Sequence, residues 1–263
     1  KKIVTRIHPA AHLDPEASVG TNVRIGPGAI IGPGVQLGDD CEVGAYAILE
    51  GIANIGSGCR IFPRAIVGGE PQVVDLKEGG GKVEIGPNTV IREMATIHRS
   101  MYEDGVTRVG SQCYFMAYPH VAHDCQVGDH VIFTNCITLG GHVEVGSHCF
   151  VSNCVGVHQF VRFGEGAIIL GPTAVRMDVP PFITLEGFPL RVRGLNVVGL
   201  RRMGVSPEIR ADLKRAYRIL FQDAKTVPEG IGRIESELTM GREVQSVIEF
   251  VQCSKRGFYR GQV

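Results

Sequence analysis

Apolar residues recur at every sixth position through the first two thirds of this chain. In steps of six from Ile7 to Val175, 27 of 29 positions are apolar, and the exceptions are Gly79 and Glu103. This period fits neither an α-helix, whose faces repeat about every 3.6 residues, nor a simple strand, whose faces alternate. It is typical of a parallel β-helix in which three hexads make one triangular coil. We therefore expect a mainly β fold of about nine coils, stacked at the ~4.8 Å spacing of neighbouring strands.

The two exceptions mark segments that leave the coil. Residues 69–84 around Gly79 and residues 99–107 around Glu103 are rich in Gly and charged side chains. We expect two external loops there, and such loops often carry function on a regular scaffold. The period stops at Pro180-Pro181, where neither residue has an amide N–H for a ladder hydrogen bond. The hexapeptide-repeat domain is thus predicted to span residues 1–181.

A C-terminal α-helical domain is predicted for residues 182–263. Ser206-Pro207-Glu208 combines an N-cap residue with a first-turn proline and a first-turn acid, and apolar residues follow at helical spacing. Shorter helical patterns cover residues 195–203, 231–238 and 244–251. Residues 176–225 hold ten basic and five acidic side chains, so this junction is a candidate dock for an acidic partner or for phosphates.

Overall charge and cysteine placement exclude several classes of protein. The 27 basic and 27 acidic side chains cancel, which argues against a nucleic-acid-binding protein, and no apolar stretch reaches the ~18 residues of a transmembrane segment. No C-x-x-C pair occurs among the eight cysteines, so neither a structural zinc site nor a disulfide framework is expected. Five of them occupy a small-residue slot two positions before an apolar step and are predicted core residues: Cys41, Cys59, Cys113, Cys125 and Cys149.

Three histidines follow apolar positions that are spaced by three hexads, or one coil. His123, His142 and His158 come just after positions 121, 139 and 157. We expect them near one edge of the prism, within roughly 10 Å along its axis. Counting back one coil at a time from position 121 leads to 103, 85 and 67, in or beside the two loops, so both loops are expected at that edge.

Two chemistries suit such an edge. A neutral imidazole can remove a proton from a sugar hydroxyl, with Asp124 holding the ring of His123 in the right tautomer. Alternatively, several histidines can bind zinc for hydration chemistry. The glycines Gly140-Gly141 favour the first reading, without a metal, because they leave room for a substrate and for a backbone N–H directed at an oxyanion.

An ordered series of motifs resembles a known enzyme family. The motifs are His120-Val-Ala-His123-Asp124-Cys125, Gly140-Gly141-His142, Val157-His158-Gln159-Phe160 and Asp178-Val-Pro-Pro181, with Asp75-Leu-Lys77 and the segments 93–99 and 196–202. They are similar to the acyl-carrier-protein-dependent UDP-N-acetylglucosamine O-acyltransferases that begin lipid A synthesis. The resemblance implies a left-handed β-helix, a homotrimer with sites between subunits, and transfer of a (3-hydroxy)fatty acyl group from acyl carrier protein to the 3-hydroxyl of the sugar.

The resemblance also implies a role for each matched residue. His123 would be the general base, Asp124 would orient it, and the Gly141 N–H would stabilise the oxyanion. The residues expected to bind the substrates are His142 and Gln159 at the sugar, Asp75, Lys77 and His120 at the acyl hydroxyl, sugar and phosphate region, Asn196 and Arg202 at the nucleotide, and Gly171 at the far end of the acyl groove. His158 is also expected to bind substrate.

No cofactor is expected, because the phosphopantetheine arrives on acyl carrier protein. The alternatives are the UDP-acyl-glucosamine N-acyltransferase of the same pathway, which normally carries an extra uridine-binding domain ahead of the coils, a zinc carbonic anhydrase on the same fold, and a non-catalytic scaffold. A cytoplasmic location is expected for a bacterial protein. The cysteine content and the absence of an initial Met make a mitochondrial protein with its leader removed the alternative.

Overall fold

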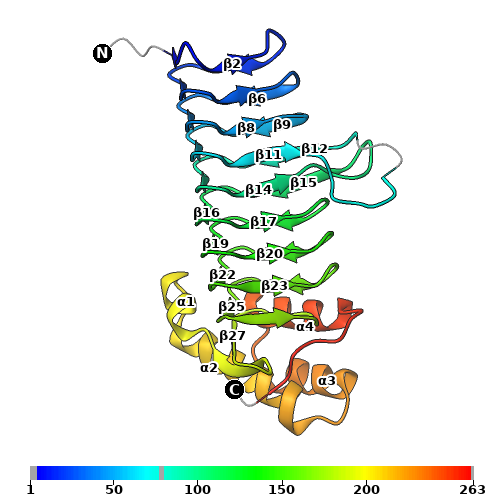
Figure 1. Ribbon diagram of the computed structural model, residues 1–263. Helices are drawn as coiled ribbons and strands as arrows, with labels where there is room; N and C mark the ends of the chain where they lie inside the picture. Colours follow the sequence, from blue (N-terminus) through cyan, green and yellow to red (C-terminus); the bar gives the residue numbers. More distant parts are fainter. Residues whose placement is uncertain (1–4, 77–79, 262–263) are drawn as a thin grey trace.

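The chain winds into a triangular prism of stacked coils, with helices packed at its C-terminal end (Figure 1). This computed structural model describes residues 5–76 and 80–261. Within those residues the strands form three sheets of eleven, nine and eight strands, parallel throughout except for the last pair of the largest sheet. The nine rungs of the second sheet confirm the number of coils expected from the hexad period.

Each coil contributes one short strand to each sheet. The first sheet holds β1 (Arg6–Ile7), β4 (Arg24–Ile25), β7 (Glu42–Val43), β10 (Arg60–Ile61), β13 (Val90–Ile91), β16 (Tyr114–Phe115), β19 (Ile132–Phe133), β22 (Phe150–Val151), β25 (Ile168–Ile169), β27 (Ile183–Glu186) and β28 (Arg191–Leu195). The second holds β2 (His12–Leu13), β5 (Ile30–Ile31), β8 (Ile48–Leu49), β11 (Ile66–Gly69), β14 (Thr96–His98), β17 (His120–Val121), β20 (Thr138–Leu139), β23 (Val155–Val157) and β26 (Thr173–Val175). The third holds β3 (Ser18–Val19), β6 (Val35–Leu37), β9 (Ile52–Ile55), β12 (Lys82–Ile85), β15 (Val106–Val109), β18 (Gln126–Val127), β21 (Glu144–Val145) and β24 (Arg162–Phe163).

The pairing register shows where the loops enter the coils. Most rungs pair residues that are three hexads apart, as Thr138 in β20 pairs with His120 in β17. Across the first loop Ile66 pairs with Thr96, a separation of five hexads, and across the second Thr96 pairs with His120, a separation of four. The first loop therefore adds two hexads to its coil and the second adds one. Because both insertions are whole hexads, the hexad phase continues unchanged through both loops.

Counting in steps of three hexads across the loops is therefore wrong. The residue that pairs with Val121 is Ile97, and Ile85 belongs to the third sheet. The shared edge is nevertheless confirmed, because both loops leave the coil at the corner between the second and third sheets, and His123 follows β17 at that same corner (Figure 1). Both loops are also shorter than expected, since β12 begins at Lys82 and β15 at Val106.

Inward-pointing side chains form one continuous core along the prism. Phe115 and Phe133 stack in its middle with ring centroids 4.5 Å apart. The five cysteines predicted as core residues are all buried, and burial raises the pKa of the Cys125 thiol to about 12. Cys136, Cys154 and Cys253 are exposed. The buried thiols therefore act as small apolar residues of the core.

The coil continues past the two prolines. Pro180 and Pro181 lie at a corner, after which β27 pairs in parallel with β25, and β28 folds back antiparallel on β27. Strand pairing thus continues past residue 181, because a corner does not need the ladder hydrogen bond that proline cannot donate.

The predicted helices follow these strands. They are α1 (Val197–Arg202), α2 (Pro207–Arg218), the π-helical turn η1 (Ile219–Asp223), α3 (Val227–Glu237) and α4 (Arg242–Cys253). Ser206 caps α2 as predicted, with its Oγ accepting the N–H of Ile209 across 3.4 Å. In the part of the chain that the structure describes, no helix is both long and apolar enough to cross a membrane.

Truncation of two adjacent isoleucines in β5 tests the coil register. Ile31 is fully buried, whereas Ile30 is 42% exposed. We expect Ile31→Ala to lower the free energy of unfolding by about 2–5 kcal/mol, because burial is lost and a cavity remains. Ile30→Ala should cost about 1 kcal/mol or less. Denaturant titration followed by circular dichroism measures both, and equal losses would contradict the assigned inward and outward faces.

Candidate active site

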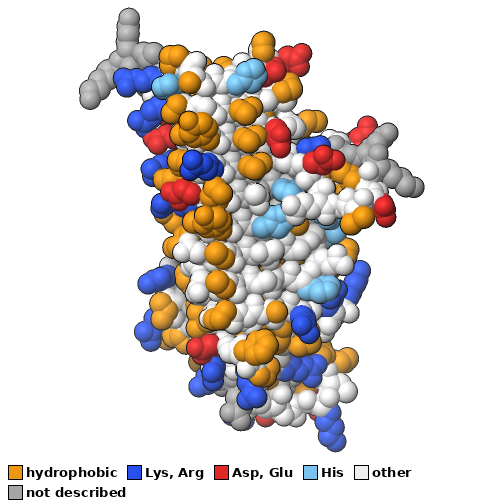
Figure 2. Space-filling view, in the orientation of Figure 1, with side chains coloured by type: hydrophobic (Ala, Val, Ile, Leu, Met, Phe, Trp, Pro, Cys, Tyr) orange, Lys and Arg blue, Asp and Glu red, His pale blue; other side chains and the backbone are white. Residues whose placement is uncertain are grey.

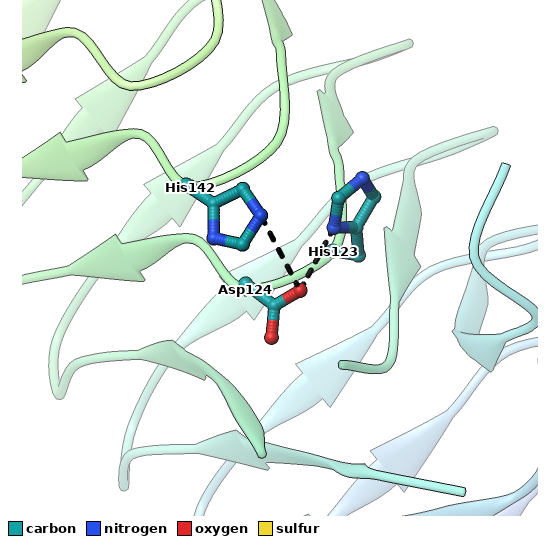
Figure 3. Close-up of side chains that lie close together, drawn as sticks. All are labelled: His123, Asp124 and His142. Atoms are coloured by element: carbon teal, nitrogen blue, oxygen red, sulfur yellow. Dashed lines mark hydrogen bonds and ion pairs between the residues drawn. The ribbon is translucent and has the colours of Figure 1, made fainter. Parts of the chain in front are cut away.

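His123, Asp124 and His142 meet at the corner between the second and third sheets (Figure 3). Nδ1 of His123 lies 2.8 Å from Oδ2 of Asp124, and Nε2 of His142 lies 4.0 Å from the same oxygen. The two imidazoles meet edge to face with centroids 5.2 Å apart. The side chains of His123 and Asp124 are 14% and 10% exposed, so the pair is shielded but reachable. A carboxylate at Nδ1 leaves Nε2 of His123 as the nitrogen that can accept a substrate proton.

The second loop holds the Asp124 carboxylate. The Ser100 hydroxyl donates to Oδ1, and the backbone N–H of Met101 donates to Oδ2 across 3.3 Å. The backbone N–H of Asp124 in turn donates to Thr107 Oγ1 at 2.7 Å. Sequence reasoning missed Ser100 and Thr107. Ser100 precedes Asp124 by four hexads, which is the register of β14 on β17, but this offset is readable only once the insertion length is known.

The backbone of the corner brings these side chains to one edge. Asp124, His142 and Phe160 occupy equivalent positions in successive coils, with φ of 61°, 59° and 63°. Non-glycine residues adopt this left-handed conformation at an energetic cost, and here it turns the chain from the second sheet into the third. The Phe160 ring stacks on His142 with centroids 4.6 Å apart and so forms a wall of the site. Figure 2 shows histidine side chains gathered around the middle of this face.

A second pair of imidazoles lies beside the first. Nδ1 of His120 lies 2.8 Å from Thr96 Oγ1, and its ring meets that of His98 edge to face at 4.9 Å. His98, which had no assigned role, is 7% exposed, and its Nδ1 has no hydrogen-bond partner among the described residues. Burial, followed by repulsion from neighbouring imidazoles, lowers the pKa of His98 to about 4. Burial also lowers the pKa of His120 and, against the opposing charge of Asp124, that of His142, so all three rings are neutral at pH 7.

Gly141 faces the reactive side of His123. A Cβ at this position would stand 2.6 Å from Cε1 and 2.7 Å from Nε2 of His123, so the close approach requires glycine. The Gly141 carbonyl accepts the N–H of Phe160 at 3.0 Å, while no acceptor among the described residues takes its own N–H. A backbone N–H beside a basic nitrogen is suited to stabilising an oxyanion.

The other predicted site residues of the coil are more dispersed. His158 and Gln159 follow β23, and Nδ1 of His158 lies 3.1 Å from Nη2 of Arg256, a residue of the C-terminal segment. Asp75 is exposed on the first loop, and Lys77 lies outside the described residues.

Asn196, Arg202 and Gly171 lie away from the histidine corner of their own chain. Asn196 is buried and caps α1, its Oδ1 accepting the N–H of Gly199 at 2.8 Å, and Arg202 is exposed in the last turn of that helix. In Figure 1, α1 lies to the left of the prism and the loops lie to the right. A Cβ at Gly171 would stand 1.9 Å from the backbone oxygen of Asn153, so packing alone requires glycine there.

The histidine corner is also the one group of potential metal ligands found among the described residues. His123, Asp124 and His142 each offer an atom, and these atoms lie within 4.8 Å of one another. The carboxylate, however, already accepts from Ser100, from the Met101 N–H and from the His123 ring. Three such donors fit a carboxylate that orients a base better than one that binds a metal.

Comparisons with known proteins agree with this geometry. Residues 16–51 match the family described as "Bacterial transferase hexapeptide (six repeats)", and residues 178–259 match "Udp N-acetylglucosamine O-acyltransferase; Domain 2". The repeats thus place the coil region in the class of hexapeptide transferases.

Similarity to individual proteins extends over nearly the whole chain. The acyl-[acyl-carrier-protein]–UDP-N-acetylglucosamine O-acyltransferase of Burkholderia lata is 39% identical, with 98% of this chain and 100% of the relative covered. The solved UDP-N-acetylglucosamine acyltransferase of Bacteroides fragilis has a TM-score of 0.93 at 35% identity, covering 97% of this chain and 100% of that one. The corresponding Arabidopsis enzyme has a TM-score of 0.83 at 30% identity, with 97% and 100% covered.

The chain therefore belongs to the family of acyl-[acyl-carrier-protein]–UDP-N-acetylglucosamine O-acyltransferases. Its fold is the predicted left-handed parallel β-helix with C-terminal helices.

The buried imidazole of His98 makes stability depend on pH. Its pKa is about 4 in the folded protein and about 6.5 in an unfolded chain, so between these values the unfolded state binds more protons. Stability should therefore rise with pH through this window and fall towards pH 4. We expect His98→Gln to reduce this dependence, measured as the denaturation midpoint across the window, while His12→Gln on the exposed surface leaves it unchanged. The same slope in wild type and His98→Gln would contradict the assignment.

Proposed function

We propose that this protein transfers a (3-hydroxy)fatty acyl group from acyl carrier protein to the 3-hydroxyl of UDP-N-acetylglucosamine, the first acylation of lipid A synthesis. The observation that carries the proposal is the His123–Asp124 pair, with Nδ1 bonded to the carboxylate and Nε2 facing Gly141. Family membership supports the donor and acceptor classes.

The reaction follows from the atoms at this corner. Nε2 of His123 removes the proton of the sugar 3-hydroxyl as its oxygen attacks the thioester carbonyl. The new C–O bond gives a tetrahedral oxyanion, which the Gly141 N–H stabilises. Collapse of this intermediate breaks the C–S bond, and the proton on His123 passes to the departing thiolate. Asp124 holds the ring in place and stabilises the imidazolium that forms between the two steps.

The reaction needs no cofactor of the protein's own. The thioester and its phosphopantetheine arm belong to the donor, and the base and oxyanion donor belong to this chain. Zinc-dependent hydration is disfavoured by the hydrogen bonds that already engage Asp124, and transfer to an amine is disfavoured by the O-acyltransferase relatives. The bacterial relatives favour the cytoplasm, while a mitochondrial location stays a prediction.

A homotrimer with sites between subunits accounts for the dispersed residues. Arg202 lies on α1, across the prism from the histidine corner of its own chain. A closed three-fold arrangement would bring α1 of one subunit to the histidine corner of the next. Arg202 would then contact the nucleotide from the neighbouring subunit, together with Asn196, whose buried side chain shapes the start of α1. Gly171 is required by packing against the Asn153 backbone as well as by any acyl groove.

Replacement of the base should slow the transfer. We expect His123→Ala to lower kcat by roughly 10² to 10⁴, because general-base assistance is lost. Transfer of a labelled 3-hydroxyacyl group from acyl carrier protein to UDP-N-acetylglucosamine measures this. His130→Ala, an exposed histidine in a neighbouring corner, should keep wild-type activity. Equal turnover by wild type and His123→Ala would remove His123 from the mechanism.

Mixing two inactive variants tests the shared site. His123→Ala and Arg202→Ala should each be weakly active alone. When the two chains are co-expressed, about a quarter of the sites in randomly mixed trimers would combine an intact His123 with an intact Arg202 of the next subunit. We therefore expect activity to recover to that level. If His123 and Arg202 of one chain served the same site, mixing the two variants would not restore acyltransferase activity.

A further inference from the structure

A pocket of about 660 Å³ adjoins the histidine corner on its C-terminal side. Its lining includes the stacked pair His142 and Phe160 and, from the segment after α4, Lys255 and Arg256. Arg162 of the third sheet also lines it. Of these residues only His142 has an expected role, at the sugar, and none takes part in the proton transfer described above.

The C-terminal segment is fixed over this pocket by a buried carboxylate. Asp178 is 1% exposed and accepts hydrogen bonds from the Arg162 N–H at 2.9 Å and from the Ser254 hydroxyl at 2.8 Å. Its backbone N–H donates to Gly257 at 2.9 Å, and its backbone oxygen accepts the N–H of Tyr259 at 3.1 Å. Lys255 and Arg256 lie between these anchor points, so their position over the pocket is built into the fold.

The charge of the pocket is positive. Lys255, Arg256 and Arg162 face it, against the carboxylates of Glu144 and Asp178. Glu144 pairs with Arg162 at 3.0 Å, and Asp178 is engaged by the neutral donors named above. The three cations and two carboxylates leave one net positive charge, and neither Lys255 nor Arg256 forms an ion pair with a carboxylate among the described residues that line the pocket. Figure 2 shows Lys and Arg side chains beside a histidine on the lower right of this face.

The contact between Arg256 and His158 orients the guanidinium. Nη2 of Arg256 lies 3.1 Å from Nδ1 of His158. The same Nδ1 also lies 3.0 Å from the backbone oxygen of Gln159, so it stands between the guanidinium and a carbonyl acceptor. The contact uses one of the five N–H groups of Arg256, and the rest of this planar fork is suited to phosphate oxygens.

We propose that this pocket binds a phosphate group of a substrate while the acyl group is transferred at His123. The inference rests on the proposed function, in which each substrate carries such a group. One is the phosphodiester of the donor's phosphopantetheine arm, and the other is the diphosphate of the acceptor. Arg256 and Lys255 would supply the charge-assisted hydrogen bonds, and the His142–Phe160 wall would connect the phosphate site to the reacting atoms.

The proposal can be tested by binding, without turnover. We would titrate 4′-phosphopantetheine and UDP into the full-length protein by calorimetry, with pantetheine and uridine as dephosphorylated controls. At least one phosphate compound should bind more tightly than its control. Arg256→Gln should weaken that binding about tenfold or more, as expected for loss of a charge-assisted hydrogen bond, and Lys255→Gln should weaken it in the same direction.

A matched control lies four positions further on. Arg260 packs over the Phe258 ring and is not part of the pocket lining, so Arg260→Gln should leave binding unchanged. Loss of 4′-phosphopantetheine binding in Arg256→Gln would identify the donor arm, and loss of UDP binding would identify the acceptor. Unchanged binding in Arg256→Gln, or no preference for either phosphate compound in the wild type, would overturn the proposal. His123→Ala should bind like wild type, which separates this result from a failure of the proposed chemistry.

Discussion

Hydrogen bonds between successive coils determine where the functional side chains lie. Each rung fixes a residue directly beside its counterpart three, four or five hexads away, and each corner repeats the same turn. Residues from β14, the second loop, β17 and β20 therefore converge although their sequence positions differ widely. The strand register therefore decides which residues surround a histidine on this scaffold. A shift of one coil would separate His123 from the second loop, which holds the Asp124 carboxylate.

Within that register, the second loop completes the site. The loop supplies the Ser100 hydroxyl and the Met101 N–H, and these donors keep the Asp124 carboxylate directed at His123. The neutral imidazoles of His98 and His142 surround the pair without adding positive charge at pH 7, because burial lowers the pKa of both. The site thus combines the corner of the coil with a loop that holds the Asp124 carboxylate in place.

Much of this could be predicted from the sequence, and the exceptions have physical causes. The fold class, the buried cysteines and the shared histidine edge could all be predicted from the hexad period. The phase of this period is the same before and after the two loops, because both insertions are whole hexads. Ser100 and Thr107 were missed because the register across an insertion depends on its length. Pro180 and Pro181 do not end the strand pairing, because a corner tolerates proline. The N-cap role of Asn196 depends on tertiary placement.

The central claim is that Asp124 keeps the proton of His123 on Nδ1 and leaves Nε2 free to act as a base. Neutron diffraction from deuterated crystals grown near pH 7 would observe this directly. We predict deuterium on Nδ1, between the ring and Oδ2 of Asp124, and an unoccupied lone pair on Nε2. Deuterium on Nε2 with Nδ1 bare would contradict the account, because the nitrogen that faces Gly141 would already carry a proton and could not take one from the acceptor hydroxyl.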